Sequence, residues 1–222
     1  MLDELLATDV LWQMSLAERA AVLYLLDSMP RRATAFEVGS CRGGFTRILA
    51  RRFETVYSID IDHSQIFDKQ SMPNVQWVTG DSALLLPSFL DPDREPYLRT
   101  HPVNLVLIDA DHSYEAVLRD IQSVLRYPPL DDVLLLMHDS WYAPVRLAID
   151  HAPWAESPYV HLVEKDFVPG DLVDGPGGKH FVGGLALALL RPDERQGDIV
   201  IGQSQDFMYR SVRDALQFAQ HP

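Results

Sequence analysis

A short apolar run ends and a glycine-rich turn begins within the segment Phe36-Glu37-Val38-Gly39-Ser40-Cys41-Arg42-Gly43-Gly44-Phe45-Thr46. The apolar run, which starts at Thr34, has the length and the residue types of a buried strand. An amphipathic run follows the turn. Glycines at positions 39, 43 and 44 allow the backbone to turn tightly and to approach a ligand closely. We therefore predict a strand, a ligand-binding turn and a helix, in this order.

The same order of apolar run, turn and amphipathic run recurs along most of the chain. The predicted strands are Thr34–Val38, Thr55–Asp60, Val75–Thr79, Val103–Asp109 and Val133–His138. The predicted helices between and after them are Gly44–Arg52, His63–Lys69, Ser82–Leu90, Ser113–Arg126 and Pro144–His151. Nearly continuous apolar strands that alternate with helices are typical of a parallel sheet covered on both faces.

The two ends of the chain follow other patterns. Residues 1–30 favour a helical N-terminal segment, in which Ser15 and Glu18 form a capping-box pair. Near the other end, Tyr159–Asp166 and Phe181–Leu190 are predicted strands with no helix between them. Because such a pair does not need a long crossover, we expect the last strand to be antiparallel.

These patterns predict a single α/β domain over residues 1–222. We expect a doubly wound, Rossmann-like, mostly parallel sheet of seven strands, with an antiparallel last strand and N-terminal helices. A C-terminal helix is expected over residues 206–220. The Gly- and Pro-rich segment 169–180 is a candidate lid loop, because it has few apolar anchors.

The chain is acidic, with 32 Asp and Glu residues against 19 Lys and Arg residues and a formal net charge of −13. Such a surface repels nucleic-acid backbones and anionic lipid, so we expect neither nucleic acid nor a membrane as a partner. Cys41 is the only cysteine, which excludes an intramolecular disulfide and a thiolate cage for zinc. We find no secretory signal and no apolar run that could span a bilayer, and we expect a cytoplasmic location.

An acidic residue stands at or near the end of each of the first five predicted strands: Glu37, Asp60, Asp81, Asp109 and Asp139. The carboxyl ends of parallel strands meet at one edge of the sheet, and open α/β sheets bind their ligands there. One Asp after a strand is often only a helix cap. Five acids in register with five strand ends favour a binding site.

The spacing of the glycines and the charge beside them argue against a dinucleotide. A dinucleotide fingerprint is G-x-G-x-x-G, whereas this turn has the spacing Gly39-x-x-x-Gly43-Gly44. Glu37, just ahead of the turn, would repel a pyrophosphate but suits a ligand with a cationic ammonium or sulfonium group. Asp60 follows where a ribose diol would need a bidentate acceptor.

These segments resemble motifs of the class I S-adenosylmethionine-dependent methyltransferases. The glycine turn resembles their first motif, Val56–Asp62 their second and Thr79–Ser82 their third. Cys41 stands where many relatives have glycine. A later segment strongly resembles the methyltransferase family 24 subgroup, which is related to the catechol and macrolide-sugar O-methyltransferases. This segment is Leu107-Ile108-Asp109-Ala110-Asp111-His112-Ser113-Tyr114-Glu115.

The resemblance implies that S-adenosylmethionine is the cofactor. It places Asp60 on the ribose hydroxyls and the third motif beside the adenine. The implied cofactor-binding residues are Glu37, Gly39, Ser40, Cys41, Gly43, Phe45, Thr46, Asp60, Ile61, Gly80, Asp81, Ser82 and Asp109.

The resemblance also implies a metal site. In these relatives a divalent cation is held by the acid after strand four and an acid after strand five, which match Asp109 and Asp139. Such an ion, Mg²⁺ or another divalent cation, would bind the substrate hydroxyl and lower its pKa. The third ligand would be His138 or Ser140. A histidine is softer than Mg²⁺ prefers and would favour Mn²⁺, Fe²⁺ or Zn²⁺.

Methyl transfer requires an acceptor oxygen that has lost its proton and lies in line with the sulfonium. Asp111 and His112 are the candidate catalytic bases. In the catechol-type relatives a lysine occupies the position of His112, and in the macrolide-sugar relatives the acid at the position of Asp111 is proposed. His112 could instead serve only as a hydrogen-bonding group at the start of the helix that follows Ser113.

The resulting hypothesis is O-methylation of a small-molecule hydroxyl, assisted by a divalent cation, in a protein that could form a homo-oligomer. The acceptor could be a sugar, a polyketide or a phenol. Two alternatives stay open. One is a cephalosporin hydroxylase-like enzyme on the same scaffold, which would depend on iron and 2-oxoglutarate. The other is a non-catalytic protein that binds S-adenosylmethionine as a structural ligand.

Overall fold

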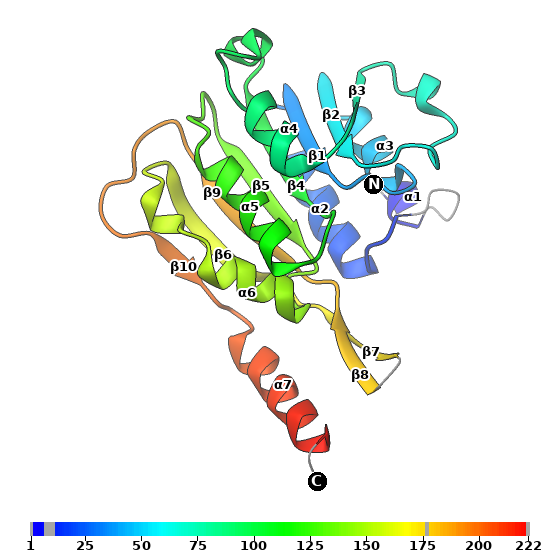
Figure 1. Cartoon of the computed structure of the whole chain (residues 1–222), viewed down its shortest axis with the longest axis vertical. Coiled ribbons are helices and arrows are strands. Elements are labelled where there is room, and N and C mark those ends of the chain that lie inside the picture. The colour runs from blue at the N-terminus through cyan, green and yellow to red at the C-terminus, as the bar shows by residue number, and fades with distance from the viewer. Residues whose placement is uncertain (1, 7–11, 176–177, 221–222) are drawn as a thin grey trace.

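The computed structural model describes residues 2–6, 12–175 and 178–220, and a twisted sheet of eight strands forms its centre (Figure 1). The strand order across the sheet is β10-β6-β9-β5-β4-β1-β2-β3. Their bounds are β1 Thr34–Val38, β2 Thr55–Asp60, β3 Val75–Thr79, β4 Val103–Ile108, β5 Val133–His138, β6 Val160–Val168, β9 Leu185–Leu190 and β10 Val200–Gly202. A separate hairpin consists of β7 (Asp171–Gly175) and β8 (Gly178–Val182).

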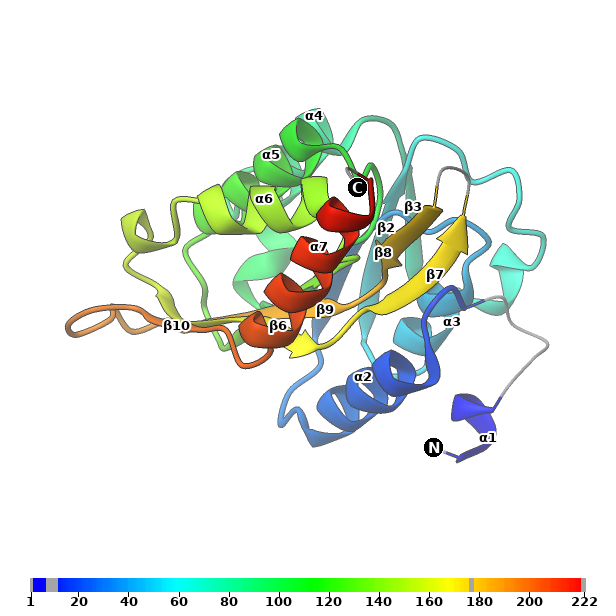
Figure 2. The same cartoon turned by 90° about the horizontal axis from the view of Figure 1, so that it is seen from below.

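Helices cover both faces of the sheet: α4, α5 and α6 lie on one face, and α2 and α3 lie on the other (Figure 2). The bounds of the α-helices are α1 Leu2–Leu5, α2 Leu16–Ser28, α3 Gly44–Ala50, α4 Ser82–Phe89, α5 Tyr114–Leu125, α6 Ala143–His151 and α7 Asp206–Gln220. In the described part of the chain, no helix has both the length and the apolar character that a membrane span requires.

The order of the strands reverses beside β1, which pairs in parallel with both β2 and β4. From β1 the chain adds β2 and β3 on one side, and then β4 and β5 on the other. In open α/β sheets, ligands bind at such a reversal, beyond the carboxyl ends of the strands. β9 runs antiparallel to β5 and β6. The predicted Rossmann-like, mostly parallel sheet with an antiparallel strand is therefore confirmed.

The core has two layers, because successive side chains of a strand point to opposite faces of the sheet. In β1, Phe36 and Val38 pack against the helices α4 to α6, and Ala35 packs against α2 and α3. All five residues of β1 are buried. This packing fixes the carboxyl ends of the central strands and so fixes the residues that follow them.

Capping groups fix where the helices near the site begin. Both halves of the predicted capping box of α2 are present: the Ser15 side chain accepts from Glu18 N, and the Glu18 side chain accepts from Ser15 N. The Asp81 side chain accepts from Ala83 N at the start of α4. The Ser113 side chain caps α5 in the same way.

The far edge of the sheet differs from the prediction. The sheet has eight strands rather than seven, because the three-residue strand β10 pairs with β6 and is too short to give a periodic signal. The predicted strand Phe181–Leu190 is two strands, divided where Gly183 and Gly184 adopt φ values of +69° and +85°. The predicted loop 169–180 is largely the β7–β8 hairpin, and its residues 176–177 lie outside the described residues.

Two helix predictions also need correction. The predicted helix His63–Lys69 is wrong: the segment forms turns and leads to a short 3₁₀ helix at Lys69–Ser71. Asp62 favours the turn, because its side chain accepts from Ser64 N at 2.7 Å. The N-terminal 30 residues contain α1 and α2, and residues 7–11 lie outside the described residues.

The C-terminal helix has the predicted bounds, Asp206–Gln220, and packs beside the base of the hairpin (Figure 1). The ring of Tyr209 in α7 stacks on Phe181 of β8, with centroids 5.4 Å apart, and lies 5.6 Å from the ring of Trp141. The guanidinium of Arg146 lies 4.8 Å from the centre of the Tyr209 ring. This aromatic cluster anchors the base of the hairpin to α7.

Candidate active site

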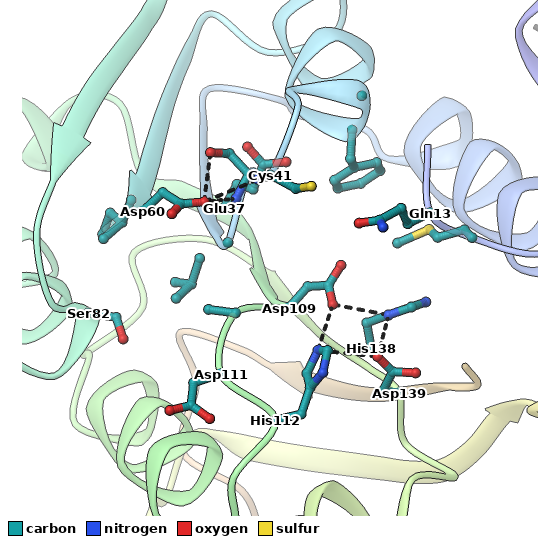
Figure 3. Close-up of a pocket in the computed structure, with 18 of the residues that line it drawn as sticks. Gln13, Glu37, Cys41, Asp60, Ser82, Asp109, Asp111, His112, His138 and Asp139 are labelled. Carbon is teal, nitrogen blue, oxygen red and sulfur yellow. Dashed lines mark hydrogen bonds and ion pairs between the residues drawn. The ribbon is translucent and has the colours of Figure 1, made fainter. Parts of the chain in front are cut away.

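A cavity of about 1140 Å³ opens where the strand order reverses, beyond the carboxyl ends of β1, β2, β4 and β5 (Figure 3). Single small-molecule sites are typically about 300–1,000 Å³, so this cavity has room for two ligands side by side. Its lining includes most of the residues singled out in the sequence: Glu37, Gly39, Ser40, Cys41, Phe45, Asp60, Ile61, Gly80, Asp81, Ser82, Asp109, Asp111, His112, His138 and Asp139.

The turn after β1 has the left-handed conformation that its glycines favour. Gly39 has a φ of +93°, and a Cβ atom at this position would overlap the backbone carbonyl of Asp109. Cys41 also has a positive φ, of +47°, and Gly43 has one of +76° at the start of α3. The turn therefore brings β1 into direct contact with the end of β4, where Asp109 begins the second half of the site.

The carboxylate of Asp60 fixes this turn. Its Oδ2 atom accepts from Ser40 N at 2.7 Å, from Cys41 N at 3.1 Å and from Ser40 Oγ at 3.1 Å. Its Oδ1 atom accepts from Asp62 N at 3.1 Å. Burial alone would raise the pKa of Asp60, but these hydrogen bonds lower it below its ordinary value. Asp60 is thus a charged group that links the ends of β1 and β2.

Glu37 is buried beneath the turn. Its Oε2 atom accepts from Thr46 Oγ1 and, at 3.1 Å, from Ser58 Oγ. Burial raises the pKa of Glu37 to about 8, more than these hydrogen bonds lower it. The side chain is therefore mostly protonated at neutral pH. Thr46 does not line the cavity itself and acts on the site through Glu37.

The third predicted motif lies at the far side of the cavity. Gly80, Asp81 and Ser82 line the cavity there, and Ile61 of the second motif is a lining residue that is 79% exposed. Asp81 already accepts from Ala83 N at 2.9 Å, and Ser82 Oγ donates to Asp120 at 3.1 Å. Gly43 does not line the cavity and instead packs against Ile66 below the turn.

Three side chains form a candidate metal centre in this cavity: Asp109 after β4, His138 at the end of β5, and Asp139. Their ligand atoms all lie within 4.8 Å of one another. His138 Nδ1 lies 3.1 Å from Asp109 Oδ1 and 3.4 Å from Asp139 Oδ2. The Oδ1 atom of Asp139 accepts from Gly183 N. Ser140 does not line the cavity, and its position leaves His138 as the third candidate ligand.

The charged forms of the histidine and the aspartates in this cluster stabilise one another. Burial alone would lower the pKa of His138, but hydrogen bonds and charges from the adjacent carboxylates raise it well above its ordinary value. The pKa values of Asp109 and Asp139 are lowered by the adjacent histidines, although burial opposes this shift. Asp139 has a φ of +53°, a left-handed conformation that is uncommon for a residue with a side chain.

Of the two candidate bases, His112 points toward the cluster (Figure 3). Its Nε2 atom lies 3.4 Å from Asp109 Oδ1 and 3.2 Å from Asp139 Oδ2, and its contact with Asp109 raises the pKa of His112. Asp111 is exposed, and its Oδ1 atom accepts from Ser113 N at 2.8 Å. Asp111 thus forms a local turn ahead of α5 and lies outside the cluster.

The N-terminal segment contributes cavity residues that no sequence pattern had placed there. Trp12, Gln13, Met14 and Glu18 line the cavity. Glu18 is 2% exposed, and its Oε1 atom lies 3.3 Å from His138 Nε2. The capping-box pattern identified Glu18 as a helix-start residue, but no local pattern indicated its contact with β5.

The cavity is strongly acidic. Among its described lining residues, Arg119 is the sole Lys or Arg side chain. The carboxylate residues in the same lining are Glu18, Glu37, Asp60, Asp81, Asp109, Asp111, Asp139 and Asp171. Even with Glu37 protonated, the negative charges outnumber the positive ones, and the potential in the cavity favours cationic ligands.

The open α/β sheet, the glycine turn after β1 and the acid at the end of β2 are features that class I S-adenosylmethionine-dependent methyltransferases share. The model of methyltransferase family 24, described as a methyltransferase domain, matches residues 36–140, from β1 through the end of β5. Over these residues the chain is a class I S-adenosylmethionine-dependent methyltransferase domain of this family. A search of curated protein sequences gives no match.

Solved structures share the fold at low sequence identity. A hemolysin candidate from Lactococcus lactis has a TM-score of 0.57 and 13% identity, covering 87% of this chain and 94% of that chain. Cofactor-bound Rv0187 from MTB has a TM-score of 0.54 and 20% identity, covering 86% and 88%. The O-methyltransferase TomG from Streptomyces achromogenes, solved in complex with S-adenosylmethionine, has a TM-score of 0.55 and 17% identity, covering 79% and 80%.

Proposed function

We propose that this protein transfers the methyl group of S-adenosylmethionine to a hydroxyl of a small-molecule acceptor, with a divalent cation held by Asp109, His138 and Asp139. One observation carries the proposal: the three metal-ligand candidates share a cavity with the glycine turn after β1. The turn and the cluster meet at the contact between Gly39 and Asp109. This arrangement supports a cofactor site and a metal site side by side.

The cofactor half of the cavity suits S-adenosylmethionine. Asp60 is ionised and held in place by the turn, and it would accept hydrogen bonds from the ribose hydroxyls with its remaining lone pairs. Ile61 offers an exposed apolar surface for the adenine next to Asp60. The acidic lining attracts the sulfonium and ammonium groups.

The metal half of the cavity has a donor set that fits a divalent cation. One nitrogen and two carboxylates within 4.8 Å of one another suit Mn²⁺, Fe²⁺ or Zn²⁺ better than Mg²⁺, because Mg²⁺ prefers oxygen ligands alone. When bound, the cation lowers the pKa of an acceptor hydroxyl that coordinates it. Asp109 and Asp139, at the ends of β4 and β5, would hold the cation beside this hydroxyl.

His112 is the proposed proton acceptor. Its Nε2 atom lies within 3.4 Å of both carboxylates, so it can reach an acceptor hydroxyl placed beside them. Asp109 and Asp139 raise the pKa of His112, and its neutral, proton-accepting form becomes available once these carboxylates are engaged elsewhere. The deprotonated oxygen then attacks the methyl carbon, and the carbon–sulfur bond breaks to release a neutral thioether.

Calorimetry on the purified protein tests the cofactor assignment. Loss of charged hydrogen bonds typically costs about 1.5–3 kcal/mol, so Asp60→Ala should weaken S-adenosylmethionine binding at least about tenfold. Asp62→Ala is the matched control, because this exposed neighbour contacts Ser64 rather than the turn. Equal affinities of the Asp60→Ala variant and the parent would remove Asp60 from the cofactor site. Transfer of a labelled methyl group to sugar, polyketide and phenol acceptors then tests the reaction.

One feature of the cluster favours a second candidate, an iron- and 2-oxoglutarate-dependent hydroxylase. Two histidines, His112 and His138, gather around the carboxylates of Asp109 and Asp139. Two histidines and a carboxylate are a typical set for non-haem Fe(II) oxygenases. Turnover of 2-oxoglutarate with Fe²⁺, without methyl transfer to any acceptor, would favour this candidate over the methyltransferase.

A further inference from the structure

Glu18 is a buried carboxylate whose position is fixed from two sides. Its Oε2 atom accepts from Ser15 N at 2.6 Å, within the first turn of α2. Its Oε1 atom accepts from Gly184 N at 2.6 Å, at the start of β9. A charge that is 2% exposed is costly to bury unless its partners are well placed. These hydrogen bonds fix the carboxylate, and its Oε1 atom is also the atom nearest the imidazole of His138.

The imidazole of His138 lies between Glu18 on one side and the two aspartates, Asp109 and Asp139, on the other. Glu18 Oε1 is 3.3 Å from Nε2, whereas Asp109 and Asp139 approach Nδ1 at 3.1 and 3.4 Å. The two nitrogens are on different sides of the ring, so Glu18 cannot share a ligand position with the two aspartates. Nε2 has no aligned hydrogen-bond partner among the described residues, which leaves a buried polar atom beside a carboxylate.

We infer that Glu18 is a positioning residue that holds the Nε2–H form of His138 and so turns the Nδ1 lone pair toward a cation bound with Asp109 and Asp139. A ligating histidine commonly donates its other N–H to a carboxylate, which fixes the tautomer and makes the ligand nitrogen more basic. The inference rests on the proposed metal-assisted function. It adds a residue from outside the segment 36–140 that matches the family model.

The junction of β8 and β9 joins Glu18 to the metal-ligand candidates a second time. Gly184 N donates to Glu18, and Gly183 N donates to Asp139. Gly183 has a positive φ, and a Cβ atom there would lie 2.9 Å from Glu18 Oε1. One short segment of backbone thus holds a ligand candidate and the carboxylate behind His138. A cation at the cluster should therefore slow hydrogen exchange in α2.

The test measures Mn²⁺ affinity of the full chain by calorimetry and by electron paramagnetic resonance, with S-adenosylmethionine affinity measured on the same samples. Glu18→Gln should weaken Mn²⁺ binding about 10- to 100-fold, the usual effect of removing such a partner, and should leave S-adenosylmethionine affinity intact. Asp27→Asn is the matched control: it removes one negative charge from the same helix, at a residue that pairs with Arg52. Ser15→Ala controls for the helix cap. Both should keep the Mn²⁺ affinity of the parent.

A double-mutant cycle shows whether Glu18 acts through His138. In a His138→Asn background, Glu18→Gln should have no further effect on Mn²⁺ affinity. Glu18→Asp, which keeps the charge, should recover part of the loss, and in Zn²⁺-loaded protein nitrogen-15 NMR should find the proton on Nε2. Unchanged Mn²⁺ affinity in Glu18→Gln, additive effects in the cycle or a proton on Nδ1 would each overturn the inference. A parent that binds no divalent cation would overturn it too, while binding of S-adenosylmethionine would show the cofactor proposal intact.

Discussion

Gly39 lies so close to Asp109 that a side chain at position 39 would overlap the backbone carbonyl of position 109. This contact holds the cofactor turn against the first residue of the proposed metal site. It exists because β1 and β4 are neighbours in the sheet, with Val38 paired to Ile108.

Gly39→Ala should destabilise the protein by more than about 2 kcal/mol. A residue with a side chain pays about 1–2 kcal/mol in a left-handed conformation, and the overlap with Asp109 adds to this cost. Gly197→Ala is the control, because Gly197 has a φ of +87° but no atom within 4 Å of an added Cβ. It should lose about 1 kcal/mol. Urea unfolding measures both, and similar losses in the two variants would contradict the role given to the contact.

Binding of S-adenosylmethionine at pH 7 should release a proton from Glu37. The pKa of Glu37 is about 8 in the free protein, and a cation bound nearby favours the ionised form. The binding enthalpy should therefore vary with the ionisation enthalpy of the buffer. Binding of the product S-adenosylhomocysteine, which has no net charge, should release fewer protons. Binding of S-adenosylmethionine to the Glu37→Gln variant should release none. An enthalpy independent of the buffer would place the cationic groups away from Glu37.

Asp139→Asn should abolish tight binding of Mn²⁺ and leave S-adenosylmethionine affinity unchanged. Asparagine tolerates the left-handed conformation of position 139 and can accept from Gly183 N, so the local backbone is kept while the charge is lost. Calorimetry measures both ligands. Chelation should stop methyl transfer in the parent, and one divalent metal should restore it. Full activity in excess EDTA would end the metal proposal.

Shortening the β7–β8 hairpin should impair acceptor turnover and leave cofactor affinity intact. Asp171 and Val182, at the base of the hairpin, line the cavity. Replacing residues 173–180 with Asn-Gly would join Leu172 to its partner Phe181 through a two-residue turn. This design keeps the aromatic contact of Phe181 with α7. If the shortened protein methylates its acceptor as fast as the parent, the hairpin is only a connector.

The buried carboxyl of Asp120 should make stability fall as pH rises from about 4 to about 6. Burial raises the pKa of Asp120 to about 6, above its ordinary value of 3.8. Between these values the folded protein binds more protons than the unfolded chain, so the free energy of unfolding decreases with pH. Two pKa units correspond to about 3 kcal/mol. Asp120→Asn should flatten this part of the profile, measured by urea unfolding, and an unchanged slope would contradict the assignment.

Periodicity predicted the central sheet well. Four of the predicted strands, Thr34–Val38, Thr55–Asp60, Val75–Thr79 and Val133–His138, have the observed bounds. Three of these strands, β1, β2 and β5, are largely buried, so their apolar runs are nearly continuous and end abruptly, whereas the edge strand β3 is only partly buried. The prediction failed where the local signal is short or mixed. β10 has three residues, and the hairpin lies largely within the Gly- and Pro-rich segment 169–180, whose composition resembles that of an irregular loop.

The candidate site could likewise be predicted only in part from the sequence. Asp109, His138 and Asp139 follow neighbouring strands, and the position of each at a strand end predicted that they would meet. The role of Glu18 in the site could not be predicted, because its contact with Gly184 spans 166 residues of sequence. The capping-box pattern also gives a complete local explanation for a glutamate at this position. A contact of this kind depends on how α2 packs, which the periodicity of the chain does not determine.

The acidic lining of the cavity has a consequence for the exchange of ligands between turnovers. S-adenosylmethionine carries a sulfonium, and the thioether that remains after transfer has lost this positive charge. Asp60, Asp109, Asp139 and the other carboxylates of the lining therefore attract the reactant more strongly than the spent product. The electrostatic part of the binding free energy thus changes with the chemistry itself. It favours replacement of each used cofactor by a fresh one, and added salt should weaken this preference.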